Sequence, residues 1–177
     1  MFLRAYKPAD KRQMQQLFYD TVHTVNARDY TQEQLDAWAP ALPNRDAWAR
    51  LEKQFCFVVE SQKEVVGFIS LTSDGLLDLL YVHTDFQGKG IARTLLKYVE
   101  RVARKHGIRL LRTEASITSL VFFEKMGFVL VAEKTKVLGE TAFPYYSMEK
   151  RLVAAVYDPK SDDRVWHRRP EAGAEDR

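Results

Sequence analysis

Polar and apolar residues recur with two different periods in the first part of the chain, and each period predicts its own kind of element. Residues 2–6 alternate, which predicts a short strand. Asp10, a typical helix cap, begins a helix whose apolar face carries Met14, Leu17, Phe18, Thr21 and Val22. Thr31 begins a second, short helix through a capping box, and this helix ends before Pro40. Asn44 caps a third helix that runs towards Gln54.

From residue 55 onward the pattern changes to strands separated by polar turns. Three apolar runs predict an antiparallel meander over 55–60, 65–71 and 76–82. An amphipathic helix follows over 90–106, and Gly107 ends it. The remaining pattern predicts a strand, a short helix and a final antiparallel pair of strands over 110–114, 118–126, 128–137 and 143–152. The expected fold class is therefore α/β, with strands and helices mixed along the sequence.

Composition and charge exclude several classes of protein. Hydrophobic residues make up 46% and charged residues 29% of the 177 residues, as in ordinary globular proteins. The net charge is only +3, with both signs mixed along the chain, so nucleic acid is not expected as a partner. No apolar run approaches the roughly 20 residues that span a bilayer, and the N-terminus lacks the layout of a signal peptide. We therefore expect a cytoplasmic protein that does not contact a membrane.

The single cysteine and the last segment complete this picture. Cys56 has no second cysteine with which to form an internal disulfide or a thiolate metal cluster, and we expect it to be an inert core thiol. Residues 158–177 are rich in charge and poor in aliphatic side chains. The sequence thus predicts one domain over 1–157, followed by a flexible tail or by an arm that packs on a neighbour.

The stretch from Leu79 to Ala92 carries the candidate chemistry. An apolar strand there enters the turn Gly88-Lys89-Gly90, which begins the amphipathic helix. Free N–H groups at a helix N-terminus bind anions, and glycine lets a phosphate approach the backbone closely. A dinucleotide-binding fingerprint needs a third glycine, but Arg93 stands there. A P-loop needs Ser or Thr where Gly90 stands. The pattern therefore predicts a phosphate-bearing ligand that neither of these two motifs binds.

Two motifs, in this order, resemble the GNAT superfamily of N-acetyltransferases. Residues 87–92, Gln-Gly-Lys-Gly-Ile-Ala, are similar to its Q/R-x-x-G-x-G/A turn. Residues 122–128, Phe-Phe-Glu-Lys-Met-Gly-Phe, are similar to its F-Y-E-K-x-G-F segment. The likeness covers residues 2–152. Residues 29–40, together with residues 114–118 and the paired phenylalanines 122 and 123, resemble an uncharacterised bacterial subgroup of small acetyltransferases. It implies a mixed, mostly antiparallel central sheet of about six to seven strands flanked by helices, with two strands splayed around the acyl donor.

The resemblance also implies acetyl-CoA as acyl donor, and no metal. The backbone of Leu80, Tyr81 and Val82 is expected to bind the pantetheine arm as an added strand would. The residues expected around the pyrophosphate belong to the turn and to the first helical turn, and are Gln87, Gly88, Lys89, Gly90, Ile91, Ala92 and Arg93. Those expected along the other side of the donor are Ser116, Phe122, Phe123 and Lys125.

The catalytic groups are less determined, because this chain departs from the family's commoner pattern. Phe123 stands where many members have a tyrosine that acts as general acid, and Ser116 stands where asparagine is common. Ser116 and Tyr146 are the candidate replacements, although solvent can protonate a good thiolate leaving group. Asp78 is the first candidate for the base that receives the amine's proton, and Glu114 is the second. Either carboxylate is alternatively a surface group paired with an arginine.

The acceptor is expected to be a small molecule with a primary amine. Aromatic rings together with a few carboxylates suit a cationic amine, and the residues assigned to its pocket are His23, Asn26, Tyr30, Trp38 and Tyr145. Alternatively, Tyr30 and Trp38 only pack the first helix on the sheet. Acetylation of a protein or peptide amine, and a non-catalytic acyl-CoA-binding module, are the competing functions. A homodimer is left open.

Overall fold

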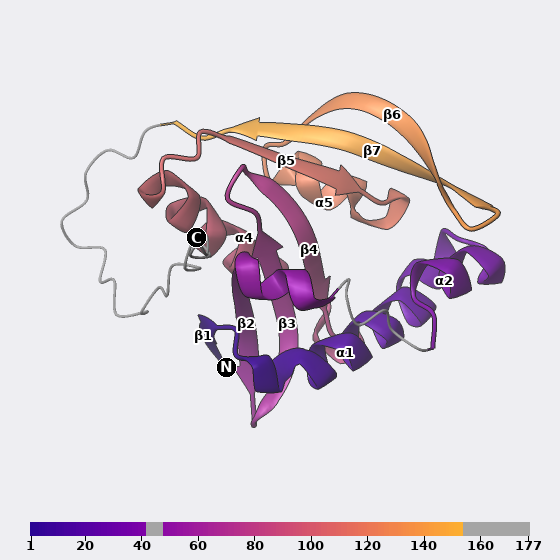
Figure 1. The fold of residues 1–177 in the computed structure, drawn as a ribbon, viewed down its shortest axis with the longest axis horizontal. Helices are drawn as coiled ribbons and strands as arrows, with labels where there is room; N and C mark the ends of the chain where they lie inside the picture. The colour runs from indigo at the N-terminus through magenta and orange to yellow at the C-terminus, as the bar shows by residue number, and fades with distance from the viewer. Residues whose placement is uncertain (42–47, 154–177) are drawn as a thin grey trace, which may run out of the picture.

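The computed structural model describes residues 1–41 and 48–153, which form one seven-stranded sheet with helices on both faces (Figure 1). The strands are β1 (Phe2–Ala5), β2 (Phe55–Ser61), β3 (Glu64–Leu71), β4 (Leu76–Val82), β5 (Leu110–Ala115), β6 (Val129–Leu138) and β7 (Thr141–Arg151). The main helices are α1 (Lys11–Thr24), α2 (Gln32–Trp38), α4 (Ile91–Lys105) and α5 (Ile117–Lys125). The start of the helix predicted at Asn44 and the tail predicted over 158–177 lie outside the described residues.

The sheet has the order β1-β2-β3-β4-β5-β7-β6, and every neighbouring pair is antiparallel except β4 and β5. Helix α4 connects these two parallel strands as a crossover. Only Leu76 and Leu77 of β4 pair with β5, opposite Arg112 and Thr113, and beyond them the two strands diverge (Figure 1). The predicted mixed, mostly antiparallel sheet is confirmed.

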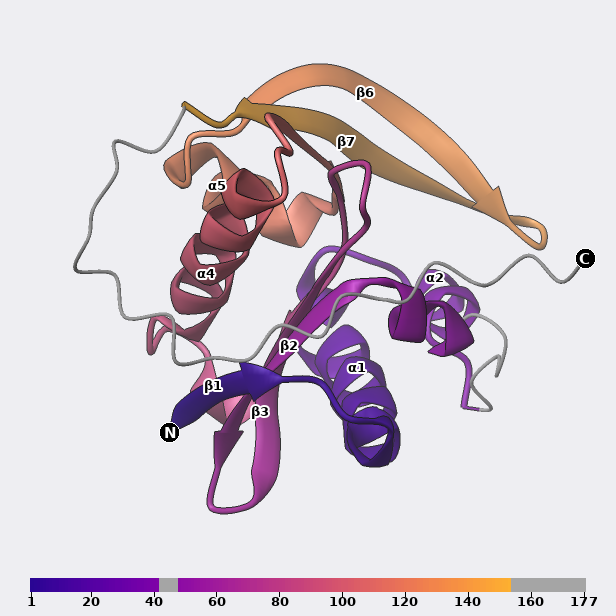
Figure 2. The same ribbon diagram turned by 60° about the vertical axis from the view of Figure 1, so that its left-hand side comes forward.

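Helices α1 and α2 cover one face of the sheet, and α4 and α5 cover the other (Figure 2). Leu95, Leu96 and Val99 of α4 are completely buried in the core on its side. On the opposite face α1 buries four of the five positions that the helical spacing predicts, Met14, Leu17, Thr21 and Val22, whereas Phe18 is half-buried. Cys56 of β2 packs in the same core as α1 and is 6% exposed, which confirms a core thiol. Within the described ranges, no helix has both the length and the apolar character that a bilayer span requires.

The residues that precede α1 and α2 act differently from each other. Thr31 Oγ1 accepts a hydrogen bond from the Gln34 N–H at 3.3 Å, and the Gln34 side chain accepts one from the Thr31 N–H at 3.0 Å, so the predicted capping box forms. Asp10 precedes α1 as expected, but its carboxylate does not cap the helix. It accepts instead from two guanidinium nitrogens of Arg4, at 2.7 and 2.8 Å, and from the Lys7 N–H at 2.8 Å. Asp10 therefore does not form the expected helix cap; it forms an ion pair that ties β1 to the start of α1.

Candidate active site

A β-bulge in β4 directs Asp78 to the face of the sheet that α1 covers. Ser70 of β3 pairs with Leu79, and the next residue of β3, Leu71, pairs with Leu77, so Asp78 has no partner in the ladder. The extra residue brings two consecutive side chains, those of Asp78 and Leu79, to the same side of the sheet, where both line a cavity. The bulge begins where β4 leaves β5, and it therefore places a carboxylate at the opening between these strands.

Two side chains from the segment before β2 hold the Asp78 carboxylate in place. Arg50 donates from Nε to Oδ2 at 2.7 Å and from Nη2 to Oδ1 at 3.3 Å. The amide of Gln54 donates to Oδ2 at 2.9 Å. Charge-assisted bonds with this fork geometry hold the carboxylate in one position and favour arginine as its partner.

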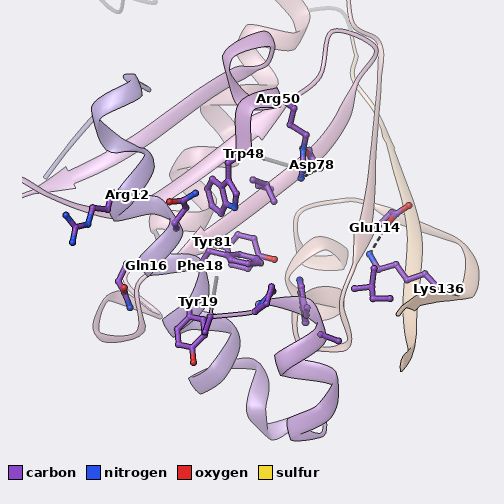
Figure 3. A pocket seen from close by; sticks show the side chains of 17 residues that line it. Arg12, Gln16, Phe18, Tyr19, Trp48, Arg50, Asp78, Tyr81, Glu114 and Lys136 are labelled. Carbon is purple, nitrogen blue, oxygen red and sulfur yellow. Dashed lines mark hydrogen bonds and ion pairs between the residues drawn. The ribbon is translucent and has the colours of Figure 1, made fainter. Parts of the chain in front are cut away.

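The cavity beside Asp78 has a volume of about 800 Å³ and lies between α1, the end of α2, and strands β4, β5 and β6 (Figure 3). Aromatic side chains form its middle, namely Phe18, Tyr19, Trp38, Trp48 and Tyr81. The Arg50–Asp78 ion pair lies on one side, and a second ion pair, between Lys136 and Glu114, lies on the other (Figure 3). The site thus combines an aromatic middle with one carboxylate at each of two edges.

The second ion pair links the end of β5 to β6. Lys136 Nζ lies 3.3 Å from Glu114 Oε2 and 5.3 Å from the centre of the Tyr145 ring. The side chain of Glu114 is 51% exposed, whereas that of Asp78 is 19% exposed. Of the two candidate bases, Asp78 is therefore the more enclosed, and each of them already has a cationic partner.

Tyr81 lies in the middle of the cavity, between the two ion pairs. Its ring packs edge-on against Phe18, with ring centres 4.9 Å apart, and lies 5.6 Å from the ring of Phe68. The indole N–H of Trp38 faces the Tyr81 hydroxyl and favours its ionised form. Burial raises the pKa of Tyr81 well above its usual range, although the nearby Trp38 N–H opposes the rise, so the hydroxyl keeps its proton. The hydroxyl is turned to the side on which Glu114 lies (Figure 3).

The start of α5 is tied to the segment between α1 and α2. Ser116 Oγ accepts from the Ser119 N–H at 3.1 Å, and Ser119 Oγ accepts from the Ser116 N–H at 2.9 Å, which makes Ser116 the cap of α5. The Tyr30 hydroxyl accepts from the Ile117 N–H at 2.8 Å, and Thr118 Oγ1 donates to Asp29 at 2.7 Å. Ser116 and Tyr30 thus have structural partners in the described part of the chain, as a cap and as a clamp on α5.

The turn before α4 is shaped for an anion. Gly88 and Gly90 have φ values of +71° and +79°, which favour glycine, and, apart from their neighbours in sequence, no atom of the described residues lies within 4 Å of where a Cβ would project from either. The N–H groups of Ile91, Ala92 and Arg93, in the first turn of α4, have no acceptor within the helix. The turn therefore presents unshielded N–H groups at the positive end of a helix, which suits a phosphate.

Strand β4 offers an open edge next to this turn. The His83 N–H bonds to Val66 O at 2.9 Å, so by the alternation of antiparallel strands Tyr81 turns its N–H and C=O to β3, whereas Leu80 and Val82 turn theirs to the gap before β5. Gln87 donates to Val82 O at 2.7 Å and so ties the turn to the end of this edge. An extended polyamide such as the pantetheine arm fits an edge of this kind.

Several predicted site residues lie away from the cavity. Tyr146 pairs with Ala115 and packs on the core beneath α4 and α5. Phe123 is a core residue, 4% exposed, packed edge-on between Phe122 and Phe128. Asn26 is buried, with 6% of its surface exposed. The ring of His23 is turned to the end of α2, where its Nε2 lies 2.9 Å from Ala39 O. Lys125 is exposed near the end of α5, and Lys89 lies over the Phe86 ring.

The structure brings together Asp78, Glu114 and Trp38 from the predicted set, and it adds residues that the sequence did not indicate. These are Phe18, Tyr19, Trp48, Arg50, Lys136 and the side chain of Tyr81. Arg50 and Lys136 belong to runs of mixed charge with no distinctive spacing, so no local signal marks them. Tyr81 lies in the strand that leads to the glycine turn. That position predicted a role for its backbone, but nothing in the sequence placed its side chain in the cavity.

Comparisons with known proteins agree with this geometry. A family model described as an acetyltransferase (GNAT) domain matches residues 26–152. The uncharacterized N-acetyltransferase YafP of Escherichia coli K12 is 31% identical over 133 residues, which are 75% of this chain and 83% of that protein. The peptidyl-lysine N-acetyltransferase YjaB of Salmonella typhimurium is 28% identical over 109 residues, 62% of this chain and 68% of that protein. A solved GCN5-related N-acetyltransferase from Rhodopseudomonas palustris superimposes with a TM-score of 0.81 and 32% identity, covering 85% of this chain and 95% of that one.

Proposed function

Because this chain belongs to the GNAT family of N-acetyltransferases, we propose that it transfers the acetyl group of acetyl-CoA to a primary amine of a small molecule, by direct attack in a ternary complex. Acetyl-CoA supplies an activated thioester that an amine can attack. The chain's own contribution is to hold the donor, to enclose the acceptor and to receive the proton that the amine loses.

The donor side of the proposal is supported by the open edge of β4 and the turn before α4. The pantetheine arm would bind along the gap before β5 to the N–H and C=O of Leu80 and to the N–H of Val82, whose C=O already accepts from Thr21 and Gln87. The N–H groups from Gly88 to Arg93 would bind the pyrophosphate. The opening between β4 and β5 leads from this turn to Asp78, at the edge of the cavity.

The observation that carries the choice of a small acceptor is the contact between α2 and the tip of the β6–β7 hairpin. The Gln34 amide donates to Ala142 O at 2.9 Å, and Thr141 Oγ1 donates to Glu33 at 3.3 Å. The next residue of β7, Phe143, packs on Trp38, with ring centres 6.4 Å apart. These contacts join α2 to the hairpin along one side of the cavity, and a walled pocket suits a small amine better than an extended peptide.

Asp78 is the proposed base. An amine attacks only as the neutral form, so a group near its nitrogen has to receive a proton, directly or through water. Asp78 is the more enclosed of the two cavity carboxylates, and Arg50 and Gln54 fix its position while part of its side chain faces the cavity. The aromatic rings in the middle of the cavity favour a cationic amine as it enters.

Acetylation of a lysine side chain in a peptide is the second candidate. It is favoured by the relative YjaB, a peptidyl-lysine N-acetyltransferase. A lysine side chain is itself a slender primary amine, and its peptide backbone would then have to lie outside the walled part of the cavity.

The test is thiol release from acetyl-CoA with a panel of amino acids, monoamines, polyamines, aminoglycosides and lysine peptides. We expect turnover with small amines, and a loss of roughly 10²-fold in kcat/KM for Asp78→Asn with a smaller loss for Glu114→Gln. Release with lysine peptides alone would favour the second candidate, and an unaffected Asp78→Asn variant would contradict the assignment of the base.

Donor binding has its own matched pair of variants. Gly90→Asp places a negative charge at the anion site, whereas Gly90→Asn has nearly the same shape without the charge, and both residue types tolerate positive φ better than most. We expect the aspartate variant to bind acetyl-CoA much more weakly than the asparagine variant in calorimetry. Equal binding by the two would argue against a phosphate at this turn.

A further inference from the structure

We propose that the Tyr81 hydroxyl donates a hydrogen bond to the sulfur of the acyl donor as the carbon–sulfur bond breaks. The proposal rests on the acetyl transfer proposed above and assigns a residue to its leaving-group side.

The placement follows from the bulged strand. Tyr81 belongs to β4, and its N–H and C=O face β3, while the two residues beside it, Leu80 and Val82, face the gap in which the donor arm fits. Its side chain enters the cavity between the Asp78 and Glu114 ion pairs (Figure 3). A single strand therefore provides both the edge that would bind the arm and the phenol that projects into the cavity.

The bonding of the hydroxyl leaves its proton free for a ligand. The Trp38 indole is a donor only, so it meets the Tyr81 oxygen on a lone pair and does not compete for the hydroxyl proton. In the part of the chain that the structure describes, the Tyr81 O–H itself donates to no other group. The packing of Phe18 and Phe68 fixes the ring that carries this hydroxyl.

The surroundings favour a hydrogen-bond donor over a group that gives up its proton. Burial holds the Tyr81 phenol in its neutral form, and the adjacent Asp78 charge adds to this effect. On the α5 side of the gap, Phe123 has no hydroxyl and is packed in the core. Of the two phenols that line the cavity, Tyr19 belongs to α1 and Tyr81 to the strand next to the gap.

The step balances without another reagent. The amine nitrogen forms a bond to the acyl carbon and loses a proton to Asp78 or water, and the electron pair of the broken carbon–sulfur bond goes to sulfur. Tyr81 shares its proton with the resulting thiolate while retaining the O–H bond, and the thiolate takes its final proton from water. A hydrogen bond of this kind stabilises the charge where it develops.

The proposal is tested on the binary complex with coenzyme A, by titrating the thiol of the bound ligand through the ultraviolet absorbance of its thiolate. Tyr81→Phe keeps the ring and removes only the hydroxyl. We expect it to raise the pKa of the bound thiol by roughly one pH unit relative to the wild-type complex. With an amine that is turned over, kcat should fall about tenfold while the KM for acetyl-CoA changes little.

Tyr6→Phe is the matched control, because it removes a buried phenol oxygen that has no hydrogen-bond partner within the described residues and lies outside the cavity. Trp38→Phe is a second variant that removes the N–H held against the Tyr81 oxygen, and it should move the thiol pKa in the same direction by less. An unchanged thiol pKa in Tyr81→Phe would overturn the proposal. Because this readout needs no acceptor, it separates failure of the Tyr81 assignment from failure to find an amine substrate.

Discussion

Single residues decide how charge is buried in this molecule. Asp10 and Glu100 are 6% and 7% exposed, and each bonds to a base from another element. Arg4 holds Asp10 at 2.7 Å, and Lys150 Nζ lies 2.6 Å from Glu100. Burial opposes the ionised form of Asp10, but the hydrogen bonds from Arg4 and from the Lys7 N–H outweigh it and lower the pKa of Asp10 below its usual value.

The first prediction concerns Asp10→Asn. At neutral pH the substitution leaves the buried Arg4 guanidinium with less compensation, and we expect the free energy of unfolding to fall by about 2 to 3 kcal/mol. Because the folded pKa is the lower one, the stabilisation is complete above the unfolded pKa and is lost as pH falls through the folded pKa. Urea unfolding should therefore show a gap between wild type and variant that narrows from pH 7 to pH 3.

The control for this prediction is Glu64→Gln, since Glu64 is an exposed carboxylate at the start of β3. It should change the free energy of unfolding by less than about 0.5 kcal/mol. A gap for Asp10→Asn that stays constant with pH would show that the loss is not electrostatic.

At the scale of elements, the capped start of α5 joins the end of β5 to the segment that precedes α2. Ser116 follows β5 directly and caps α5, and the next residue, Ile117, is bound by Tyr30 from the segment before α2. A shift of the first turn of α5 would therefore also displace the segment that precedes α2. The cap fixes both elements relative to the gap between β4 and β5.

The second prediction follows from this cap. Ser116→Ala removes the acceptor for the Ser119 N–H and should lower the free energy of unfolding by about 1 kcal/mol. Ser116→Asn supplies another good cap and should restore most of that loss. Chemical denaturation of the three proteins checks this, and equal stability of the alanine and asparagine variants would contradict a capping role.

Features that depend on neighbours in the sequence were predictable, whereas those that depend on distant contacts were not. The capping box at Thr31 formed as predicted because its partner is three residues away. The same kind of signal misled at Asp10, because Arg4 competes successfully for its carboxylate. At the site, the sequence indicated Asp78 and Glu114, but their partners Arg50 and Lys136 lie 28 and 22 residues away along the chain. A bulge and a long-range ion pair leave no periodic trace.

At the scale of the whole molecule, the sheet consists of two parts held together by few direct contacts. Two residue pairs connect β4 to β5, and further on the strands separate. On the cavity side, α2 makes a second connection between the two parts of the sheet, because Gln34 and Glu33 bond to the tip of the β6–β7 hairpin. The cavity therefore lies beside the place where β4 and β5 separate, and the hydrogen bonds between α2 and the hairpin tip close one end of it.

The third prediction tests this closure with Gln34→Glu. A glutamate can still accept from the Thr31 N–H, so the capping box survives, but it cannot donate to Ala142 O. We expect faster hydrogen exchange in the hairpin and a KM for the acceptor that is higher by roughly threefold to tenfold, with the KM for acetyl-CoA unchanged. Gln62→Glu, the same change at the exposed β2–β3 turn, should do neither. Unchanged exchange in the hairpin would show that this bond does not hold it.

The buried cysteine of β2 has a practical consequence for all of these measurements. Cys56 is the one thiol of the chain, and burial both shields it and raises its pKa, so a thiol reagent reacts poorly with it in the native protein. Colour that develops in a disulfide-exchange assay of the folded enzyme then reports coenzyme A alone. When the protein opens globally, one further equivalent of thiol becomes reactive. The same reagent can thus follow turnover in one experiment and unfolding kinetics in the next, with no label attached.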